Sequence, residues 1–191
     1  MWQIRHRVVK GGLITAVTES WFPSSDDEWN FFLEDDISVS PLFYIWAKYA
    51  LLTYQYGAPE DRMPDFMGVS LYTPRMIETA KERFKVDLPT DMKRVTGHRY
   101  TPFLDQVPCS WGALYSPTVW KEFRNYLRMR LEQGESVKMN IPGSRINGWK
   151  GSWKKYLMEM SYSRGLYMLY PNFKDQVLLT KRAATTRKAG H

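Results

Sequence analysis

Residues 29–41 read WNFFLEDDISVSP: a short apolar run ends in three consecutive acids, and a Ser-Pro pair follows. A short apolar run bounded by polar residues predicts a β-strand that is buried on both faces of a sheet. The pair Ser40-Pro41 predicts a helix start, because serine caps free amide groups and proline is tolerated at the first helical position. This stretch therefore predicts a strand, an acidic loop and a helix in succession, which indicates an α/β fold.

The three acids Glu34, Asp35 and Asp36 directly follow the predicted strand. In open α/β sheets, ligands bind beyond the carboxyl ends of the strands, and three carboxylates there repel one another unless positive charge joins them. A hard divalent cation such as Mg²⁺ or Mn²⁺, bound through oxygen together with substrate phosphates, is the simplest candidate. The alternative is an acidic loop in water beside the positive N-terminus of the following helix. The residues by themselves leave both interpretations open.

The same order of strand and helix recurs along the chain. Two further pairs, Thr73-Pro74 and Ser116-Pro117, repeat the helix-start signal. Strands that alternate with helices predict an α/β layered fold, here a mixed sheet flanked by helices. The first helix is apolar on most of its faces, so we expect it to be well buried. The predicted strands cover residues 13–17, 29–33, 67–71, 111–115 and 166–170; the predicted helices cover 41–57, 74–86, 117–134 and 149–165; and a long loop covers 87–108.

The composition indicates one packed domain. Of the 191 residues, 43% are hydrophobic and 15% aromatic, which argues for a core and against disorder. The predicted domain covers residues 1–177, and a polar, basic tail over residues 178–191 is expected to be disordered. The single cysteine, Cys109, excludes an internal disulfide. Because no stretch approaches about 18 consecutive apolar residues, the sequence predicts no membrane span.

The net charge of +7 raises the question of a nucleic-acid partner. The tail carries four of the positive charges and no acid, so the rest of the chain has a net charge of only +3. A modest positive charge fits an anionic small molecule as well as a polymer. The distribution of charge therefore argues against nucleic acid as the main partner.

Three blocks of the sequence resemble segments of known enzymes. FLEDDISVSP (residues 32–41) resembles the strand, acidic loop and helix of GT-A-fold glycosyltransferases, including the N-acetylglucosaminyltransferase I type. PCSWGALYSP (108–117) resembles their acceptor-side segment, and PGSRINGWKGSWKK (142–155) resembles a block of a glycosyltransferase-like group in eukaryotes. The resemblance covers roughly residues 12–173. It implies a partial GT-A-like fold that transfers a sugar from a nucleotide-sugar donor to a glycan or glycoprotein acceptor.

In that family the acidic triplet binds a divalent metal, Mn²⁺ or Mg²⁺, which holds the diphosphate of the donor. The resemblance implies that Asp36 is the direct metal ligand, and that Asp35 and Glu34 support it or face the ribose. A metal at this position neutralises the charge that grows on the leaving diphosphate. The resemblance also implies a location in the secretory pathway, such as the Golgi.

The two later blocks hold the candidate substrate-binding residues. A loop rich in glycine and proline can offer cations and amides to phosphate or to sugar hydroxyls, and tryptophan can stack on a sugar ring. The alternatives are a solvated basic turn and tryptophans that belong to the core. The candidates are Ser110, Trp111, Arg145, Asn147, Trp149 and Lys150, of which Trp149 is the best-placed tryptophan because it lies where a loop meets a helix.

Two features depart from the family pattern. Only about thirty residues precede the acidic triplet, whereas a GT-A domain begins with a nucleotide-binding half, so we expect a fragment or a reduced relative. Residues 149–153 contain no acid that could act as the catalytic base, and the nearest carboxylates are Asp105 and Glu159. Two other functions therefore stay open: a nucleic-acid-binding or Mg²⁺-dependent phosphodiester-acting module, and an inactive glycosyltransferase fragment.

Overall fold

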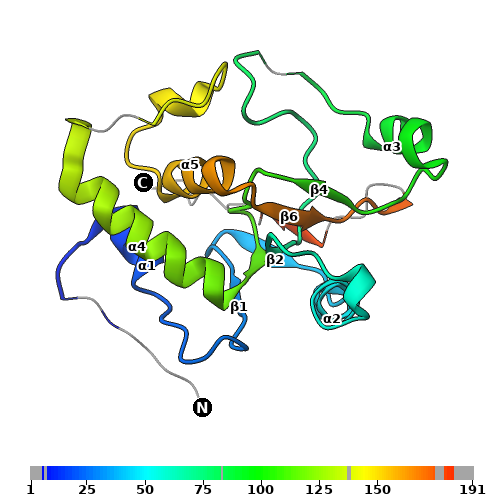
Figure 1. The fold of residues 1–191 in the computed structure, drawn as a ribbon, viewed down its shortest axis with the longest axis horizontal. Coiled ribbons are helices and arrows are strands. Elements are labelled where there is room, and N and C mark those ends of the chain that lie inside the picture. The colour runs from blue at the N-terminus through cyan, green and yellow to red at the C-terminus, as the bar shows by residue number, and fades with distance from the viewer. Residues whose placement is uncertain (1–5, 7, 83, 137–138, 175–178, 183–191) are drawn as a thin grey trace, which may run out of the picture.

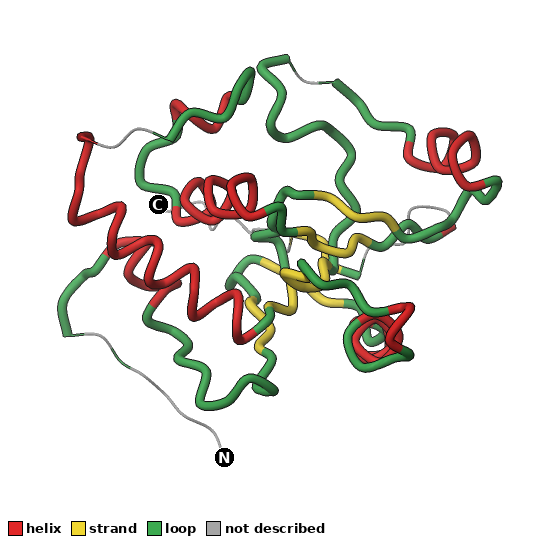
Figure 2. Tube along the Cα trace, viewed as in Figure 1, coloured by secondary structure: helices red, strands yellow, loops and turns green. Residues whose placement is uncertain are grey.

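The computed structural model describes residues 6, 8–82, 84–136, 139–174 and 179–182 (Figure 1). It confirms the predicted fold class, because a mixed five-stranded sheet is flanked by helices. Figure 2 shows the strands near the centre of the molecule with the helices around them. The helices are α1 Gly12–Thr18, α2 Phe43–Tyr54, α3 Leu88–Thr96, α4 Pro117–Gln133 and α5 Trp153–Arg164, with 3-10 turns η1 Pro59–Asp61, η2 Gly134–Ser136 and η3 Arg145–Gly148. The strands are β1 Asn30–Phe32, β2 Ile37–Val39, β3 Phe66–Ser70, β4 Phe103–Asp105, β5 Ala113–Tyr115, β6 Tyr167–Tyr170 and β7 Thr180–Arg182.

The strands of the main sheet lie in the order β1-β5-β3-β6-β4. β1 and β3 each pair antiparallel with β5, β3 pairs parallel with β6, and β4 pairs antiparallel with β6. Three strands, β1, β3 and β6, therefore run in the same direction, and their carboxyl ends share one edge of the sheet with the first residues of β4 and β5. β2 and β7 form a separate antiparallel pair.

Both faces of the main sheet are covered, because neighbouring residues of a strand point to opposite sides. On β5, Ala113 and Tyr115 belong to a core cluster with residues of α4 and α5, whereas Leu114 belongs to a second cluster with residues of α2. Met168 and Leu169 of β6 divide between the two clusters in the same way. The sheet therefore lies between α4 and α5 on one face and α2 on the other (Figure 1).

Proline and glycine signals placed several elements correctly. α4 begins at Pro117, directly after Ser116, and Gly134 follows its last residue. α5 is followed by Gly165, which adopts the left-handed conformation (φ 68°) that glycine takes without strain. The strands predicted at 67–71, 111–115 and 166–170 correspond to β3, β5 and β6.

The segment predicted as the first strand, residues 13–17, is the helix α1 instead. Its Thr18 is buried, and Ile14 and Val17 pack against the cluster that contains α4 and α5. The positions 14, 17 and 18 follow helical spacing. The strand prediction was wrong because so short an apolar segment does not distinguish a helix from a strand.

The segment predicted as a second helix, residues 74–86, is irregular in its described part. Met76 and Lys85 form an isolated antiparallel bridge. The hydroxyl of Thr73 donates to the carbonyl of Pro171 at 2.7 Å, a bond between residues 98 positions apart. Tertiary contacts of this kind outweigh the local Thr-Pro signal, because helix propensity is a weak determinant beside them.

The sequence did not predict several of the elements, among them β2, which follows the acidic triplet where a loop was expected. α3 and β4 lie within residues 87–108, which were expected to form a loop. β7 lies in the segment that was expected to be a disordered tail, and its first residue, Thr180, is buried together with Leu179. The remaining residues of that tail, 178 and 183–191, lie outside the described part of the chain.

β1 differs from the expected doubly buried strand. Its residues are only half-buried, because β1 lies at the edge of the sheet with β5 as its one neighbour in the main sheet. Its two phenylalanines still contact the core on opposite sides: Phe32 lies against Trp120 with ring centroids 4.4 Å apart, and Phe31 lies against Phe43 at 5.2 Å.

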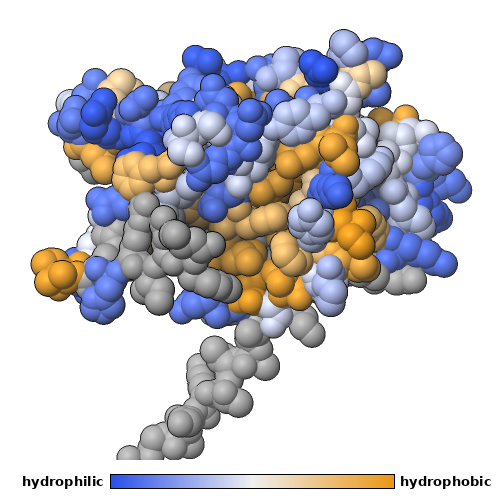
Figure 3. Space-filling model, turned by 90° about the horizontal axis from the view of Figure 1, so that it is seen from below, coloured by the Kyte–Doolittle hydropathy of each residue, from blue (hydrophilic) through white to orange (hydrophobic). Residues whose placement is uncertain are grey.

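α2 is less buried than the sequence predicted. Trp46, Ala47 and Ala50 face the sheet, but Tyr44, Ile45, Tyr49 and Leu52 are exposed. Figure 3 shows hydrophobic side chains gathered on the face of the molecule to which α2 belongs. Among the described residues, no helix combines the length and the apolar character that crossing a bilayer requires.

Candidate functional site

Three segments that are far apart in the sequence meet at the edge where β1, β3 and β6 end. The acidic triplet follows β1, residues 71–75 follow β3, and residues 110–112 precede β5. The register makes them neighbours, because Ala113 of β5 pairs with Phe32 on one side and with Ser70 on the other. Ligands of open α/β sheets bind beyond such carboxyl ends. This edge of the sheet is therefore the candidate site.

The acidic triplet forms a turn between β1 and β2. The backbone N–H of Ile37 donates to the carbonyl of Glu34 at 3.2 Å. Glu34 and Asp35 are exposed, whereas Asp36 is half-buried. The segment before β5 lies beside this turn, since a Cβ placed on Gly112 would lie 3.5 Å from Cδ2 of Leu33.

The oxygen donors of the acidic turn decide which kind of metal site it can form. Within the described residues, no group of three or more His, Cys, Asp or Glu side chains converges on a point where it could hold a metal ion. Mg²⁺ does not need such a group, since it usually binds through one or two carboxylates together with substrate phosphates and water. The half-buried Asp36, with Asp35 and Glu34 beside it, fits a metal of this kind that is shared with a diphosphate.

A cavity of about 450 Å³ opens between the segment after β3, the loop between β4 and β5, and the first turn of α5. Its volume lies within the range of about 300–1,000 Å³ that is typical of small-molecule sites. Four residues that the sequence singled out line this cavity: Asp105, Ser110, Trp111 and Arg145. The acidic triplet is not part of the lining.

An ion pair between a buried lysine and a half-buried glutamate lies in the wall of the cavity. Nζ of Lys154, in the first turn of α5, lies 2.7 Å from Oε1 and 2.6 Å from Oε2 of Glu78. The lysine side chain is 9% exposed and the glutamate side chain 36%. The pair ties residues 74–86 to α5, and its two charges cancel inside the cavity.

Asp105 places a carboxyl group inside the cavity at the end of β4. Burial raises the pKa of Asp105, while hydrogen bonds from the backbone N–H groups of Val107 and Gln106 lower it by a smaller amount. The N–H of Val107 donates to Oδ1 of Asp105 at 3.2 Å. Asp105 therefore gains protons more readily than an ordinary aspartate does.

Two buried tyrosines hold the loop that leads from Asp105 to Trp111. The hydroxyl of Tyr170 donates to the carbonyl of Val107 at 2.6 Å, and that of Tyr115 donates to the carbonyl of Cys109 at 2.8 Å. Burial raises the pKa of both tyrosines well above the usual value, so both remain donors. The loop is thus held rigidly over the sheet.

Trp111 provides an aromatic surface at the mouth of the cavity. It is 45% exposed, whereas Trp21, Trp46, Trp120 and Trp153 are buried. Its ring centroid lies 5.1 Å from that of Tyr72, which follows β3. Two neighbouring rings, one of them open to solvent, form a surface on which the apolar face of a sugar can stack.

The other three substrate-binding candidates lie outside the cavity lining. The side chain of Asn147 closes its own loop: it donates to the carbonyls of Ile141 (2.8 Å) and Ser144 (2.9 Å) and accepts from the N–H of Ile141 (3.0 Å). Trp149 is half-buried beneath Arg145, whose guanidinium carbon lies 5.7 Å from the ring centroid. Lys150 is exposed.

The second candidate base, Glu159, lies in the core rather than in the cavity. It is 1% exposed, and its Oε2 accepts from Nε of Arg130 at 3.1 Å and from the hydroxyl of Tyr126 at 3.1 Å. These contacts join α5 to α4. The environment of Glu159 therefore fits a role in stability.

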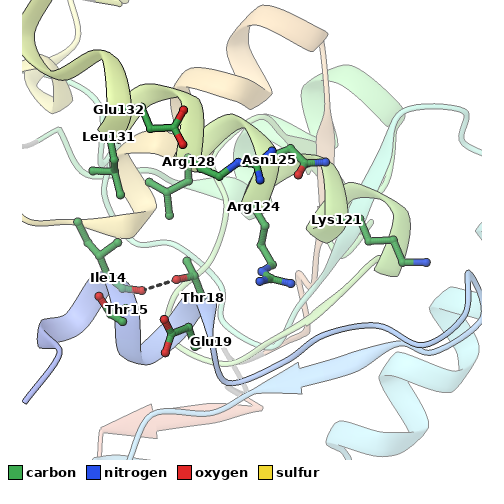
Figure 4. A pocket seen from close by; sticks show the side chains of 11 residues that line it. Ile14, Thr15, Thr18, Glu19, Lys121, Arg124, Asn125, Arg128, Leu131 and Glu132 are labelled. Carbon is green, nitrogen blue, oxygen red and sulfur yellow. Dashed lines mark hydrogen bonds between the residues drawn. The ribbon is translucent and has the colours of Figure 1, made fainter. Parts of the chain in front are cut away.

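A second, larger cavity of about 740 Å³ lies between α1 and α4 (Figure 4). Figure 4 shows Arg124 pointing into the space between the two helices. The guanidinium of Arg124 lies 3.6 Å from the ring centroid of Phe22, and Lys121 binds Asp26 at 2.9 Å. Arg124 and Lys121 are thus engaged by the chain itself, Arg128 is the third cation of the lining, and no sequence-predicted site residue lines this cavity.

Sequence reasoning missed several residues of the first cavity. Lys154 lies inside the block that resembles glycosyltransferases, but its partner Glu78 is 76 residues away, so the pair has no local signal. Arg75 and Glu78 lie in the segment that was expected to be a helix. Tyr72 follows a predicted strand end, which is the one signal that could have marked it.

The chain belongs to the SPBC1E8.03c C-terminal domain family, whose model matches residues 2–136. The match includes the acidic turn and the loop that carries Asp105, Ser110 and Trp111, and it ends before Arg145 and Lys154. None of the curated proteins matches the chain.

Proposed function

We propose that this protein is a metal-dependent glycosyltransferase-like protein that moves a sugar from a nucleotide-sugar donor to a glycan acceptor. The observation that carries the proposal is that an acidic turn and a cavity with an exposed tryptophan share the edge of one α/β sheet. The acidic turn suits the diphosphate of a donor, and the cavity with its tryptophan suits a sugar. Sequence blocks that resemble glycosyltransferases supply both features.

The donor binds at the acidic turn in this proposal. Asp36, supported by Asp35 and Glu34, would hold the Mn²⁺ or Mg²⁺ ion that the diphosphate requires. When bound, the metal neutralises the negative charge that develops on the leaving nucleoside diphosphate. The protein's own part is to place these carboxylates at a strand end, where a ligand can approach them.

The acceptor binds in the cavity. Its sugar ring stacks on Trp111, and Ser110 and Asp105 offer hydrogen-bonding groups to its hydroxyls. β1 and β4 are the two outermost strands of a five-stranded sheet. Four strand spacings of about 4.8 Å therefore separate their backbones by about 19 Å. Because a base must lie within about 3 Å of the proton it removes, this separation favours Asp105 as an acceptor-binding group over a base for chemistry at Asp36.

A thermal-shift screen of nucleotide sugars, with and without Mn²⁺, tests the proposal. A ligand that binds the folded state raises the melting temperature by an amount that grows with its concentration relative to its dissociation constant. We expect at least one nucleotide sugar to raise the melting temperature only when Mn²⁺ is present. The corresponding nucleoside, which lacks a diphosphate, is the matched control and should have no effect. If no nucleotide sugar stabilises the protein with Mn²⁺, the proposed function is wrong.

A further inference from the structure

The acceptor cavity contains more positive charge than its own residues neutralise. Three cations line it, Arg75, Arg145 and Lys154, and Lys154 is paired with Glu78. No carboxylate in the described part of the chain lies within ion-pair distance of Arg75 or Arg145. Two guanidinium groups therefore remain available to a ligand.

The backbone holds both arginines at the cavity. The N–H of Arg145 donates to the carbonyl of Thr79 at 3.0 Å, which fixes the start of η3 against the segment that follows β3. The carbonyl of Arg75 accepts from the N–H of Val86 at 3.1 Å. The ring of Trp149 supports the guanidinium of Arg145 from one side. The two charges are thus attached to anchored backbone and not to a free loop.

The carboxyl groups of the lining do not balance its cations, because the two acids Glu78 and Asp105 face three cations. Asp105 is half-buried, and this burial raises its pKa, so the cavity favours the uncharged form of this group more than water does. Its Oδ1 is also bound to the N–H of Val107. The field inside the cavity is therefore positive on balance, and a neutral sugar would leave it uncompensated.

The chemistry of two guanidinium groups favours phosphate over carboxylate. Each guanidinium carries five N–H donors in a planar fork, which matches the oxygens of carboxylate or phosphate. A carboxylate offers two oxygens and one negative charge, whereas a phosphate monoester offers three terminal oxygens and a charge of about −1.5 to −2 at pH 7. Two guanidinium groups balance the charge of a phosphate monoester, and their N–H donors match its three terminal oxygens.

We propose that the acceptor is a phosphate-bearing sugar whose ring stacks on Trp111 and whose phosphate binds Arg75 and Arg145. This inference rests on the proposed function, because it names the class of acceptor for that site. The inference requires a single ligand that carries both a sugar ring and a phosphate, since the aromatic surface and the two arginines line the same cavity.

Binding of glucose 6-phosphate, methyl glucoside and inorganic phosphate, measured by NMR titration, tests the inference. We expect the sugar phosphate to bind at least about tenfold more tightly than either part, since a hydrogen bond to a charged group contributes enough for such a ratio. Arg75→Met and Arg145→Met should each remove most of this preference and leave the weak binding of methyl glucoside unchanged. Arg94→Met, on the exposed face of α3, is the matched control and should change nothing.

Two results would overturn the inference. One is equal affinity for glucose 6-phosphate and methyl glucoside in the unmodified protein. The other is loss of Mn²⁺-dependent nucleoside diphosphate binding in Arg145→Met, which would assign the arginine to the donor. Asp36→Ala separates this inference from the proposed function, because it should abolish metal-dependent diphosphate binding and leave sugar phosphate binding intact. A melting temperature within a few degrees of the unmodified protein shows that each arginine variant is folded.

Discussion

Removal of the Glu159 carboxylate is expected to destabilise the protein strongly. Glu159 is 1% exposed and Arg130 is 7% exposed, and the pair is joined by contacts of 3.1 and 3.5 Å. Glu159→Ala removes a buried carboxylate from its ion pair with Arg130, and breaking a buried pair by removing one partner costs about 3–5 kcal/mol. Tyr126, whose pKa is raised to about 12 by burial and by Glu159, also loses its acceptor.

Urea denaturation monitored by circular dichroism measures this loss. Against a typical domain stability of about 5–15 kcal/mol, a loss of about 4 kcal/mol lowers the melting temperature by about 8–16 °C for a chain of this size. The double variant Arg130→Met with Glu159→Leu is the control, since replacing a buried pair by apolar residues of similar volume is often neutral or stabilising. If Glu159→Ala unfolds within about 1 kcal/mol of the unmodified protein, the buried pair is not what holds α4 to α5.

Three further predictions concern Asp105 and Trp111 of the cavity and Gly112 just before β5. Asp105→Asn should raise the melting temperature at pH 7, because burial raises the pKa of Asp105 in the folded state and its charged form is destabilising there. This advantage should shrink as the pH falls through the folded-state pKa, and melting curves from pH 3 to 8 measure it; a constant advantage at every pH would contradict the assignment. Gly112→Ala should cost about 1–3 kcal/mol in urea denaturation, because its φ is +94° and the new Cβ would lie 2.6 Å from Cγ2 of Thr180. Trp111→Ala should weaken sugar binding in NMR titrations by about tenfold, with little change in melting temperature because the side chain is 45% exposed; unchanged sugar affinity would remove Trp111 from the site.

The elements that the sequence predicted well carry strong local signals. Ser116-Pro117 and Gly165 mark the start of α4 and the end of α5, because proline and glycine restrict the backbone wherever they occur. Local signals failed where tertiary contacts decide the structure. Residues 74–86 begin with a helix signal, but the bond from Thr73 to Pro171 and the pair Lys154–Glu78 hold their described part in an irregular conformation.

Some residues of the candidate site could likewise be predicted from the sequence, and others could not. Ser110 and Trp111 could be singled out because they belong to a recognisable block just before a predicted strand, and Asp105 because it is one of the carboxylates nearest to residues 149–153 in sequence. The structure brings all three into one cavity with Arg145. Arg75 could not be found from sequence, because its place in the cavity depends on a chain path that crosses from β3 to α5. Asn147 belongs to the same block as Arg145, yet its side chain is used to close its own loop.

Calorimetric titration of a nucleoside diphosphate, with and without Mn²⁺, tests the role of the acidic turn most directly. Asp36→Ala should abolish the gain in affinity that Mn²⁺ gives, whereas Asp65→Ala should keep it, because Asp65 is an exposed aspartate just before β3, at the opposite edge of the sheet. An undiminished gain in Asp36→Ala would show that the acidic turn is not the donor site.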